Sequence, residues 1–244
     1  MQVLILTAGE SKRLRPLTDK HPKSLLKISD KEILHHILDT CQACGLKKFS
    51  LLTGHGHEHV VAFSEKYKKN NPDVSIEIIY NNEYNSKGNI HSLYSAKPIF
   101  SNDFIIINSD TIFHKNILQA LLDHPQKNVM AIDDFKKLSD EEMKVYIDKD
   151  NKIHKIHKTL KPEIANGEYI GLMKLGSEFK QALINSLETV MQNDPSLYYE
   201  DALQHFIDQD APIYKISTSG LPAMEIDTHE DLKNAKQLIQ QIIP

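Results

Sequence analysis

Short apolar runs alternate with longer amphipathic stretches over the first half of the chain. Predicted strands lie at 3–6, 49–52, 76–80 and 104–107. Apolar residues at helical spacing predict helices over 34–46 and 58–69, and Gly45 supplies a stop for the first of them. Strands that alternate with helices predict an α/β fold, in which a Rossmann-like, mixed but mostly parallel sheet is flanked by helices.

The second half of the chain is less regular. Two stretches, 143–146 and 152–158, flank a turn-rich segment at 148–151 and predict a β-hairpin. A helix is expected over 228–243, directly after a short predicted strand. The polar segment 133–142 separates the two halves without the composition of a linker, so we expect one domain over 1–244.

Charge and hydropathy narrow the choice of partners. The 244 residues include 29 Lys and Arg against 33 Asp and Glu, a net charge of −4 with both signs mixed along the chain. This balance offers no basic surface, so we expect neither nucleic acid nor a membrane as a partner. No apolar stretch approaches the ~20 residues of a membrane span, and the N-terminal MQVLILTAGE lacks a basic leader region. We therefore expect a cytoplasmic protein with a small ligand; its oligomeric state stays open.

The first predicted strand runs directly into a motif that suits phosphate groups. Gly9 lets the backbone approach a ligand, and exposed N–H groups beyond such a turn attract phosphate oxygens. Arg13 offers a planar guanidinium and Lys23 a compact charge. Gly9 is the only glycine before Gly45, so neither a Walker loop nor a dinucleotide-binding fingerprint is present. The pattern predicts a triphosphate site that includes Thr7, Ala8, Gly9, Glu10, Arg13 and Lys23.

The ordered string LxAGxxxRLxPLTxxxPK, from Leu6 to Lys23, resembles the signature of nucleotidyltransferases that make activated sugars and activated lipid or glycan head groups. The resemblance implies a nucleotide-diphospho-sugar transferase-like fold and catalytic roles for Arg13, Lys23 and Asp110. Many members carry a second glycine where this chain has Ser11, so we expect a slightly stiffer loop. The alternative is that the basic residues are solvated loop charges.

Asp110 follows the predicted strand 104–107, at the carboxyl edge where open α/β sheets bind ligands. In the family that the chain resembles, this aspartate holds Mg²⁺ and a second acidic residue arrives from a late strand. Here the match is Asp227, and Glu225 stands two residues earlier on the same side of the predicted strand. The resemblance therefore implies Mg²⁺ bound by Asp110 and Asp227. Alternatively, Asp227 and Thr228 cap the following helix.

Residues 81–93 are dense in amides and hydroxyls. Amide side chains donate and accept hydrogen bonds, which suits the mixed edge of a pyrimidine. The pattern NxxYNxxxNxxSL is similar to a loop of bacterial phosphocholine cytidylyltransferases and of related enzymes that activate aminoethylphosphonate. The resemblance points to CTP, and a plain turn that caps the next helix is the alternative. The expected nucleotide contacts in this segment are Asn81, Gly88, Asn89 and Ser92.

The second half offers candidates for an acceptor site. The predicted hairpin brings two lysines together, and lysines suit a phosphate or phosphonate group. Downstream stretches match the same subfamily, and a tyrosine face with carboxylates suits a small ammonium group. The tyrosines could alternatively be ordinary packing residues. The expected acceptor contacts are Lys144, Lys158, Glu168, Tyr199, Glu200, Asp201 and Glu225.

Two departures from the subfamily bear on the acceptor. The chain has Glu142-Met143 and Ala223 where phosphocholine enzymes carry aromatic residues. A full aromatic cage for a trimethylated amine is therefore not evident, and a primary amine such as aminoethylphosphonate stays open beside phosphocholine.

The resemblance implies a Mg²⁺-dependent enzyme that transfers CMP from CTP to a small phosphorylated or phosphonate acceptor and releases pyrophosphate. Residues at about 1–132 would form the nucleotide-binding half and those at about 133–244 the acceptor-binding half. Two alternatives stay open: a sugar-1-phosphate nucleotidyltransferase that makes an NDP-sugar, and a non-catalytic nucleotide-sensing subunit.

Overall fold

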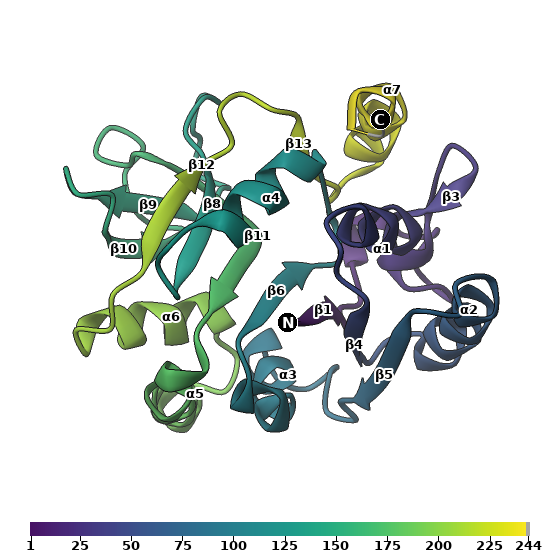
Figure 1. Cartoon of the computed structure of the whole chain (residues 1–244), viewed down its shortest axis with the longest axis horizontal. Helices are drawn as coiled ribbons and strands as arrows, with labels where there is room; N and C mark the ends of the chain where they lie inside the picture. The colour runs from purple at the N-terminus through teal and green to yellow at the C-terminus, as the bar shows by residue number, and fades with distance from the viewer. Residues whose placement is uncertain (243–244) are drawn as a thin grey trace.

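The computed structural model describes residues 1–242 and shows a central sheet with helices on both faces (Figure 1). Its N-terminal part is a run of four parallel strands. In sheet order these are β6 (Phe104–Asn108), β1 (Gln2–Thr7), β4 (Lys48–Thr53) and β5 (Ser75–Tyr80). Parallel neighbours need a crossover. Helices α1 (Ile33–Ala43) and α2 (His57–Asn70) supply the crossovers from β1 to β4 and from β4 to β5.

The second half of the chain joins the same sheet through one long strand. Strand β11 (Gly167–Leu175) runs antiparallel to β6, and it also pairs with β8 and β9. The nine-stranded sheet thus combines parallel and antiparallel pairs and confirms the predicted α/β class with a mixed sheet flanked by helices. The remaining strands of this part are β8 (Val129–Asp133), β9 (Lys144–Ile147), β10 (Ile153–His157) and β12 (Tyr214–Ser217).

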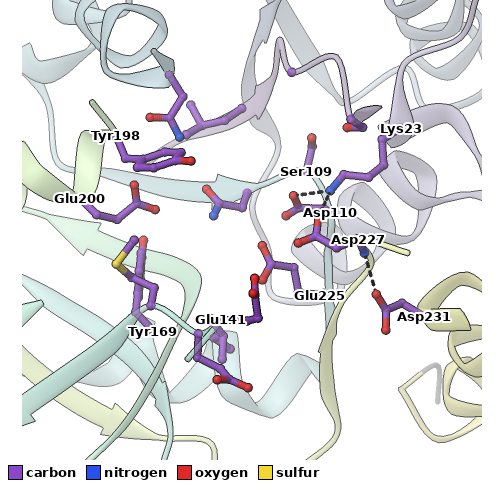
Figure 2. A pocket seen from close by; sticks show the side chains of 18 of the residues that line it. Lys23, Ser109, Asp110, Glu141, Tyr169, Tyr198, Glu200, Glu225, Asp227 and Asp231 are labelled. Carbon is purple, nitrogen blue, oxygen red and sulfur yellow. Dashed lines mark hydrogen bonds and ion pairs between the residues drawn. The ribbon is translucent and has the colours of Figure 1, made fainter. Parts of the chain in front are cut away.

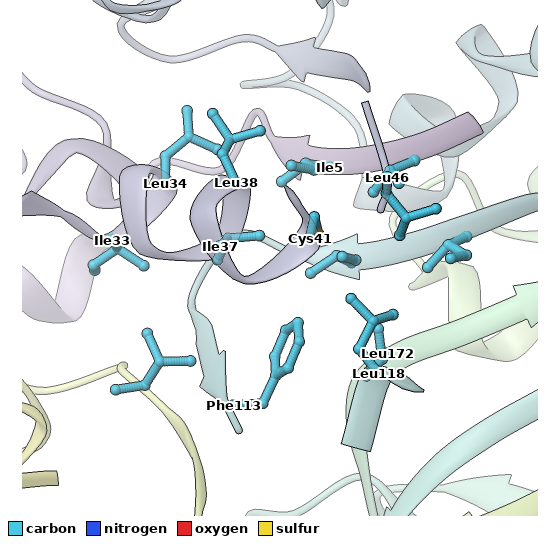
Figure 3. Close-up of a cluster of buried hydrophobic side chains, with 14 of the residues drawn as sticks. Ile5, Ile33, Leu34, Ile37, Leu38, Cys41, Leu46, Phe113, Leu118 and Leu172 are labelled. Atoms are coloured by element: carbon cyan, nitrogen blue, oxygen red, sulfur yellow. The ribbon is translucent and has the colours of Figure 1, made fainter. Parts of the chain in front are cut away.

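The two faces of the sheet carry separate hydrophobic clusters. In β1, the side chains of Val3 and Ile5 belong to one cluster and that of Leu4 to the other. Because both faces are covered, the strand is continuously apolar from residue 3 to residue 6 rather than alternating. Figure 3 shows the first cluster, where α1 packs on the sheet together with Phe113 and Leu118. The first cluster also includes α4 (Lys115–Asp123) and α7 (His229–Ile242), and the second is built on α3 (Asn89–Ser95), α5 (Lys180–Asn193) and α6 (Tyr199–Asp208).

Most predicted elements are found within a few residues of their expected bounds. The helix expected over 34–46 is α1, which ends before Gly45, and Gly45 takes the left-handed conformation with φ 79°. The expected hairpin is β9 paired with β10. Helix α7 matches the helix expected over 228–243, whose last residue lies outside the described part. Within residues 1–242, no helix is both long enough and apolar enough to cross a membrane.

A small ladder brings the end of the chain to the carboxyl edge of the main sheet. Strand β13 (Ala223–Glu225) pairs antiparallel with β7 (Thr111–Phe113), so that Glu225 lies opposite Thr111. The backbone N–H of Ile226 then donates to the carbonyl of Asp110 over 2.9 Å. Late acidic residues are thereby placed directly beside the end of β6. A second two-stranded ladder, of β2 (Lys27–Ile28) and β3 (Lys31–Glu32), precedes α1.

The start of α3 is docked against the segment that leads into α6. The N–H of Gly88 donates to the carbonyl of Pro195 over 2.9 Å, and the Asn89 side chain accepts from the N–H of Tyr199 over 2.8 Å. A Cβ at Gly88 would lie 2.1 Å from the carbonyl oxygen of Leu197. Residue 88 must therefore be glycine for these two segments to touch.

We predict that Gly88→Ala lowers the free energy of unfolding by about 1–3 kcal/mol, because the added methyl group forces the two segments apart. Gly9→Ala is the matched control, since a Cβ there meets no protein atom within 4 Å. Urea unfolding monitored by circular dichroism measures both. Equal stability of the two variants would contradict the close approach at Gly88.

Candidate active site

A cavity of about 800 Å³ opens at the carboxyl ends of β1 and β6 and extends to the second half of the chain. This volume lies toward the upper end of the usual range for ligand sites, so it has room for a nucleotide and a small second molecule. Thirteen of the residues predicted from the sequence line it. They are Thr7, Ala8, Gly9, Arg13, Lys23, Asn89, Ser92, Asp110, Lys158, Glu168, Glu200, Glu225 and Asp227.

The loop after β1 forms one wall. Thr7 is buried, and its hydroxyl donates to the carbonyl of Leu52 over 2.9 Å, which ties the loop to β4. The space beside Gly9 is free of protein atoms, so a glycine there leaves room for a ligand and is not demanded by packing. Ser11 adopts φ 49°, a left-handed conformation that glycine takes more easily. This strain is what would be expected of a serine at a position where the resemblance implies a glycine.

Three carboxylates meet at the edge of this wall. One oxygen from each of Asp110, Glu225 and Asp227 lies within 4.8 Å of the others. Asp110 lies two residues after the end of β6, Glu225 ends β13 and Asp227 follows it. Figure 2 shows the three carboxylates close together. The predicted convergence of Asp110 with the late acidic pair is thus present in the geometry.

Two cations compensate this cluster. The Lys23 ammonium lies 2.8 Å from a carboxylate oxygen of Asp110 and 2.6 Å from one of Asp227, and Arg13 also pairs with Asp227. Burial alone would lower the pKa of Lys23, but Asp110 and Asp227 outweigh it and raise that pKa. The ammonium is therefore charged at any physiological pH.

The pKa values of Glu225 and Asp227 are shifted in opposite directions. Burial raises the pKa of Glu225, and the negative charges of Asp110 and Asp227 raise it further. For Asp227, burial is opposed by Lys23 and Arg13, which lower its pKa. Hard oxygen donors at this spacing fit Mg²⁺, which needs only one or two protein carboxylates beside the phosphates of its substrate.

The helix after Asp227 is capped without using the Asp227 carboxylate. Both the N–H and the hydroxyl of Thr228 donate to the side chain of Asp231 over 2.8 Å, and the N–H of Asp227 donates to the same side chain over 3.1 Å. The two roles considered for this segment are thus divided between residues. Thr228 and Asp231 cap the start of α7, while the Asp227 carboxylate faces the cavity.

The far end of the cavity is acidic. Lys136 pairs with Glu168 over 2.8 Å and with Glu142 over 3.3 Å. Burial raises the pKa of Glu168 although Lys136 opposes the shift. Partial burial alone would also raise the pKa of Glu142, but hydrogen bonds from Ser139 lower it to about 2. One lysine thus compensates two carboxylates.

Glu200 is the least compensated group of this end. Its side chain lines the cavity, the residue is only 6% exposed, and its Oε2 atom has no hydrogen-bond partner among residues 1–242. Burial raises the pKa of Glu200 to about 7. Nearby, the Lys158 ammonium lies 5.3 Å from the centre of the Tyr198 ring, so the face of this ring accommodates a cation. An unpaired buried carboxylate in a cavity wall is suited to a cation or a hydroxyl group of a ligand.

Six predicted contacts lie outside the cavity lining, and for those the geometry corrects the sequence prediction. The Glu10 carboxylate forms ion pairs with Lys12 and Arg15. The Asn81 side chain accepts from the N–H of Glu83 and donates to the Ser92 hydroxyl. These contacts match the alternative prediction for this segment, a plain turn that caps the next helix. Gly88, as described above, is packed on Leu197.

The other three corrections fall in the second half. The Lys144 ammonium is fully buried and donates to loop carbonyls. Tyr199 is also fully buried. Its hydroxyl donates to the Asn108 side chain over 3.0 Å and lies 3.2 Å from the Tyr169 hydroxyl, so it is the packing residue of the tyrosine pair. Asp201 accepts from the N–H of Tyr198 and so caps α6. None of the three is placed to touch an acceptor directly.

Several lining residues escaped the sequence prediction. Tyr198, rather than its neighbour Tyr199, faces the cavity, and the residue type alone could not tell which of the two points inward. Lys136 lies in a polar segment with no motif, and its partner Glu168 is 32 residues away. Ser24 follows Lys23, lines the cavity and has a buried hydroxyl without a partner. In the sequence, only its position next to Lys23 could have indicated that Ser24 belongs to the site.

The fold and this cavity place the chain among the open-sheet α/β proteins, whose ligands bind at the carboxyl edge of the strands. The family described as "Nucleotidyl transferase" matches residues 2–220. The chain therefore belongs to that family, as the resemblance of its first motif predicted.

Comparison with individual proteins gives three further findings. Over 245 residues the chain is 28% identical to the bifunctional IPC transferase and DIPP synthase of Aquifex aeolicus (strain VF5), covering 97% of this chain and 51% of that protein. It is 27% identical over 119 residues to the choline-phosphate cytidylyltransferase of Streptococcus pneumoniae (strain ATCC BAA-255 / R6), covering 49% of this chain and 48% of that protein. The chain thus spans about half the length of the curated relatives it matches.

The third finding is a solved structure, the inositol-1-phosphate CTP transferase from T. maritima. It superposes with a TM-score of 0.83 at 21% identity, over 99% of this chain and 95% of that one. At this identity the likeness concerns the fold, and it confirms the predicted nucleotide-diphospho-sugar transferase-like architecture.

We predict that Glu200→Gln stabilises the protein at pH 8. A carboxyl group whose pKa rises from 4.5 to about 7 on folding loses stability as the pH rises between these values, because only the folded state holds the proton there. Removing the charge should therefore raise the free energy of unfolding at pH 8 by up to about 3 kcal/mol, with the gain disappearing near pH 4.

Urea unfolding at pH 4, 6 and 8 measures this difference. Glu163→Gln is the matched control, since Glu163 is exposed, and it should follow the unsubstituted protein at every pH. If Glu200→Gln were no more stable than the unsubstituted protein at pH 8, burial of the Glu200 carboxylate would not destabilise the folded protein, which would contradict the prediction.

Proposed function

We propose that the chain is a Mg²⁺-dependent cytidylyltransferase that transfers CMP from CTP to a small phosphorylated or phosphonate acceptor and releases pyrophosphate. The observation that carries the proposal is the cavity itself. One end of it joins Lys23 to the carboxylates of Asp110, Glu225 and Asp227, and the other end presents acidic groups from the second half of the chain. Membership in the nucleotidyl transferase family supports the class of reaction.

The proposed reaction is an in-line displacement. An oxygen of the acceptor phosphate or phosphonate forms a bond to the α-phosphorus, while the bond from that phosphorus to the β-phosphate oxygen breaks. The electron pair leaves with pyrophosphate. The attacking oxygen is already anionic near neutral pH, so no general base is needed and the protein has to position two anions and offset their charge.

Arg13 and Lys23 would supply the positive charge at the triphosphate. Both are already held at the cavity wall by their ion pairs with Asp227, so little reorganisation is needed when a phosphate arrives. Asp110, Glu225 and Asp227 are the groups that would hold Mg²⁺, which when bound neutralises phosphate charge and orients the triphosphate.

Residues at about 1–132 would hold the nucleotide. The amide-rich segment lines the cavity with Tyr84, Lys87, Asn89 and Ser92, and of these Asn89 and Ser92 are the predicted contacts with the base. Amide and hydroxyl groups suit a pyrimidine edge. The choice of CTP is also supported by two similar proteins, since the T. maritima protein is a CTP transferase and the S. pneumoniae relative is a cytidylyltransferase.

Residues at about 133–244 would hold the acceptor. The uncompensated Glu200 carboxylate and the Tyr198 ring suit a small ammonium group, and Lys158 suits its phosphate or phosphonate. One exposed ring face does not make a cage for a trimethylated amine. We therefore favour a primary amine over choline.

Carboxylates also accept hydrogen bonds from hydroxyl groups, so a sugar-1-phosphate is the second candidate acceptor. A non-catalytic nucleotide-sensing subunit is disfavoured because a binding protein needs neither the lysine nor the acidic cluster. This chain retains Lys23, Asp110 and Asp227 together.

We expect Lys23→Ala and Asp110→Ala each to reduce turnover by about a hundredfold or more, because each removes charge that acts on the transferring phosphate. Pyrophosphate release at saturating substrates measures the effect, with circular dichroism to show that the fold persists. Lys47→Ala is the control, since Lys47 is exposed, pairs with Asp73 and does not line the cavity. Near-normal turnover of either site variant would remove that residue from the proposed role.

The substrate is identified by pyrophosphate release with Mg²⁺ and each of the four NTPs against phosphocholine, aminoethylphosphonate, phosphoethanolamine and hexose-1-phosphates. We expect release with CTP and a primary-amine acceptor, and none after EDTA is added. Release only with a hexose-1-phosphate would support the second candidate. Nucleotide binding that is insensitive to EDTA and yields no pyrophosphate with any acceptor would favour the binding protein.

A further inference from the structure

Lys144 is a buried lysine whose hydrogen-bond partners are all backbone groups. The residue opens β9 and is fully buried. Its ammonium donates to the carbonyl oxygens of Ser139, Asp140 and Glu142, over 3.0, 3.2 and 3.1 Å. An ammonium has three donors, so each hydrogen of the Lys144 head group has an acceptor. The segment 139–142, called here the acceptor loop, is thus wrapped around one cation.

The same loop is closed on itself by a side chain. The Glu142 carboxylate accepts from the N–H of Ser139 over 2.8 Å and from its hydroxyl over 2.7 Å. Lys144 therefore binds the inner, carbonyl side of the loop, while Glu142 fixes its first N–H group. Without the ammonium, these three carbonyl oxygens would lose the donor that they share.

The loop borders the acidic end of the cavity. Glu141, Glu142 and Met143 line it, whereas Lys144 does not. In the β9–β11 ladder Lys144 lies opposite Glu168, so both side chains project from the same side of the sheet. Lys136 forms ion pairs with both Glu168 and Glu142 and so connects β11 to the acceptor loop. The position of Glu142 and the Lys136 bridge thus depends on how Lys144 holds the loop.

We propose that Lys144 is a positioning residue for acceptor binding: its buried ammonium holds the acceptor loop so that Glu142 and the Lys136–Glu168 pair face the cavity. The inference rests on the proposed function, because it assigns the acidic end to the acceptor. It replaces the predicted direct contact of Lys144 with a phosphate by an indirect role in the same half of the site.

The chain provides a matched control. Lys174, on β11, is also buried, and its ammonium also donates to backbone carbonyls, those of Leu122 and His124, over 3.4 and 2.8 Å. These carbonyls lie at the end of α4, and neither they nor Lys174 line the cavity. Replacing either lysine by methionine therefore removes a buried ammonium of the same kind, but only Lys144 supports the acceptor loop.

The first test is steady-state kinetics of Lys144→Met and Lys174→Met, with the acceptor that the unsubstituted protein uses. Lys144→Met should raise the KM for the acceptor about tenfold or more and leave the KM for CTP within about twofold, because misplaced binding groups weaken one substrate only. Lys174→Met should lower the Tm and leave both KM values unchanged. Equal changes in both KM values for Lys144→Met, or none, would overturn the proposal.

The second test needs no substrate. Hydrogen–deuterium exchange of the free protein should be about tenfold faster over 134–143 in Lys144→Met than in Lys174→Met, since the loop loses its central donor. Unchanged exchange there would overturn the proposal. If the unsubstituted protein released no pyrophosphate with any acceptor, the proposed function would be refuted. If that protein is active but Lys144→Met changes its two KM values equally, only the role of Lys144 is refuted.

If Lys144→Met does not fold, Ser139→Ala tests the loop from its exposed side. This change removes the hydroxyl that donates to Glu142 and leaves the core untouched. It should raise the KM for the acceptor about threefold without changing the KM for CTP, as expected for the loss of one hydrogen bond of about 0.7 kcal/mol. An unchanged KM for the acceptor would count against the loop as a positioning element.

Discussion

Mutual repulsion among three carboxylates is the constraint on which the site depends. Asp110, Glu225 and Asp227 are held within 4.8 Å of one another by the end of β6 and by the short β7–β13 ladder. The ammonium of Lys23 lies between two of them and is almost fully buried. Lys23 comes from a loop near the start of the chain, whereas β13 comes from its end. The ion pairs therefore join the first and last parts of the sequence at the one place where the proposed reaction needs charge.

The cavity has two ends with different electrostatic character. At the triphosphate end, cations and carboxylates are paired, so that an incoming phosphate meets charges already held in place. At the other end carboxylates exceed cations, and the Oε2 atom of Glu200 is left without a partner in the described part of the chain. An uncompensated buried carboxylate costs stability in the free protein, and such a cost is retained where a ligand can offset it. This asymmetry is why the two halves of the cavity suit different molecules.

The acceptor end also depends on polar contacts between neighbouring segments of the chain. Lys144 binds backbone carbonyls, Asn89 accepts from the N–H of Tyr199, and the Tyr199 hydroxyl donates to Asn108 at the end of β6. The first contact holds the loop before β9, and the other two join the start of α6 to α3 and to the end of β6. Under the proposed function, these contacts position the segments that would hold the acceptor.

The sequence by itself determined the α/β class, because strands covered on both faces are continuously apolar and helices keep their own period. It also determined the phosphate motif and the candidate acidic residues, since these are local patterns of residue type. Only the tertiary structure decided which neighbour of a pair faces the cavity. Tyr198 lines it while Tyr199 is buried, and Lys144 turns to its own loop although Lys158 lines the wall. The physical reason is that side-chain direction and polar partners depend on segments far apart in the chain, which no local pattern records.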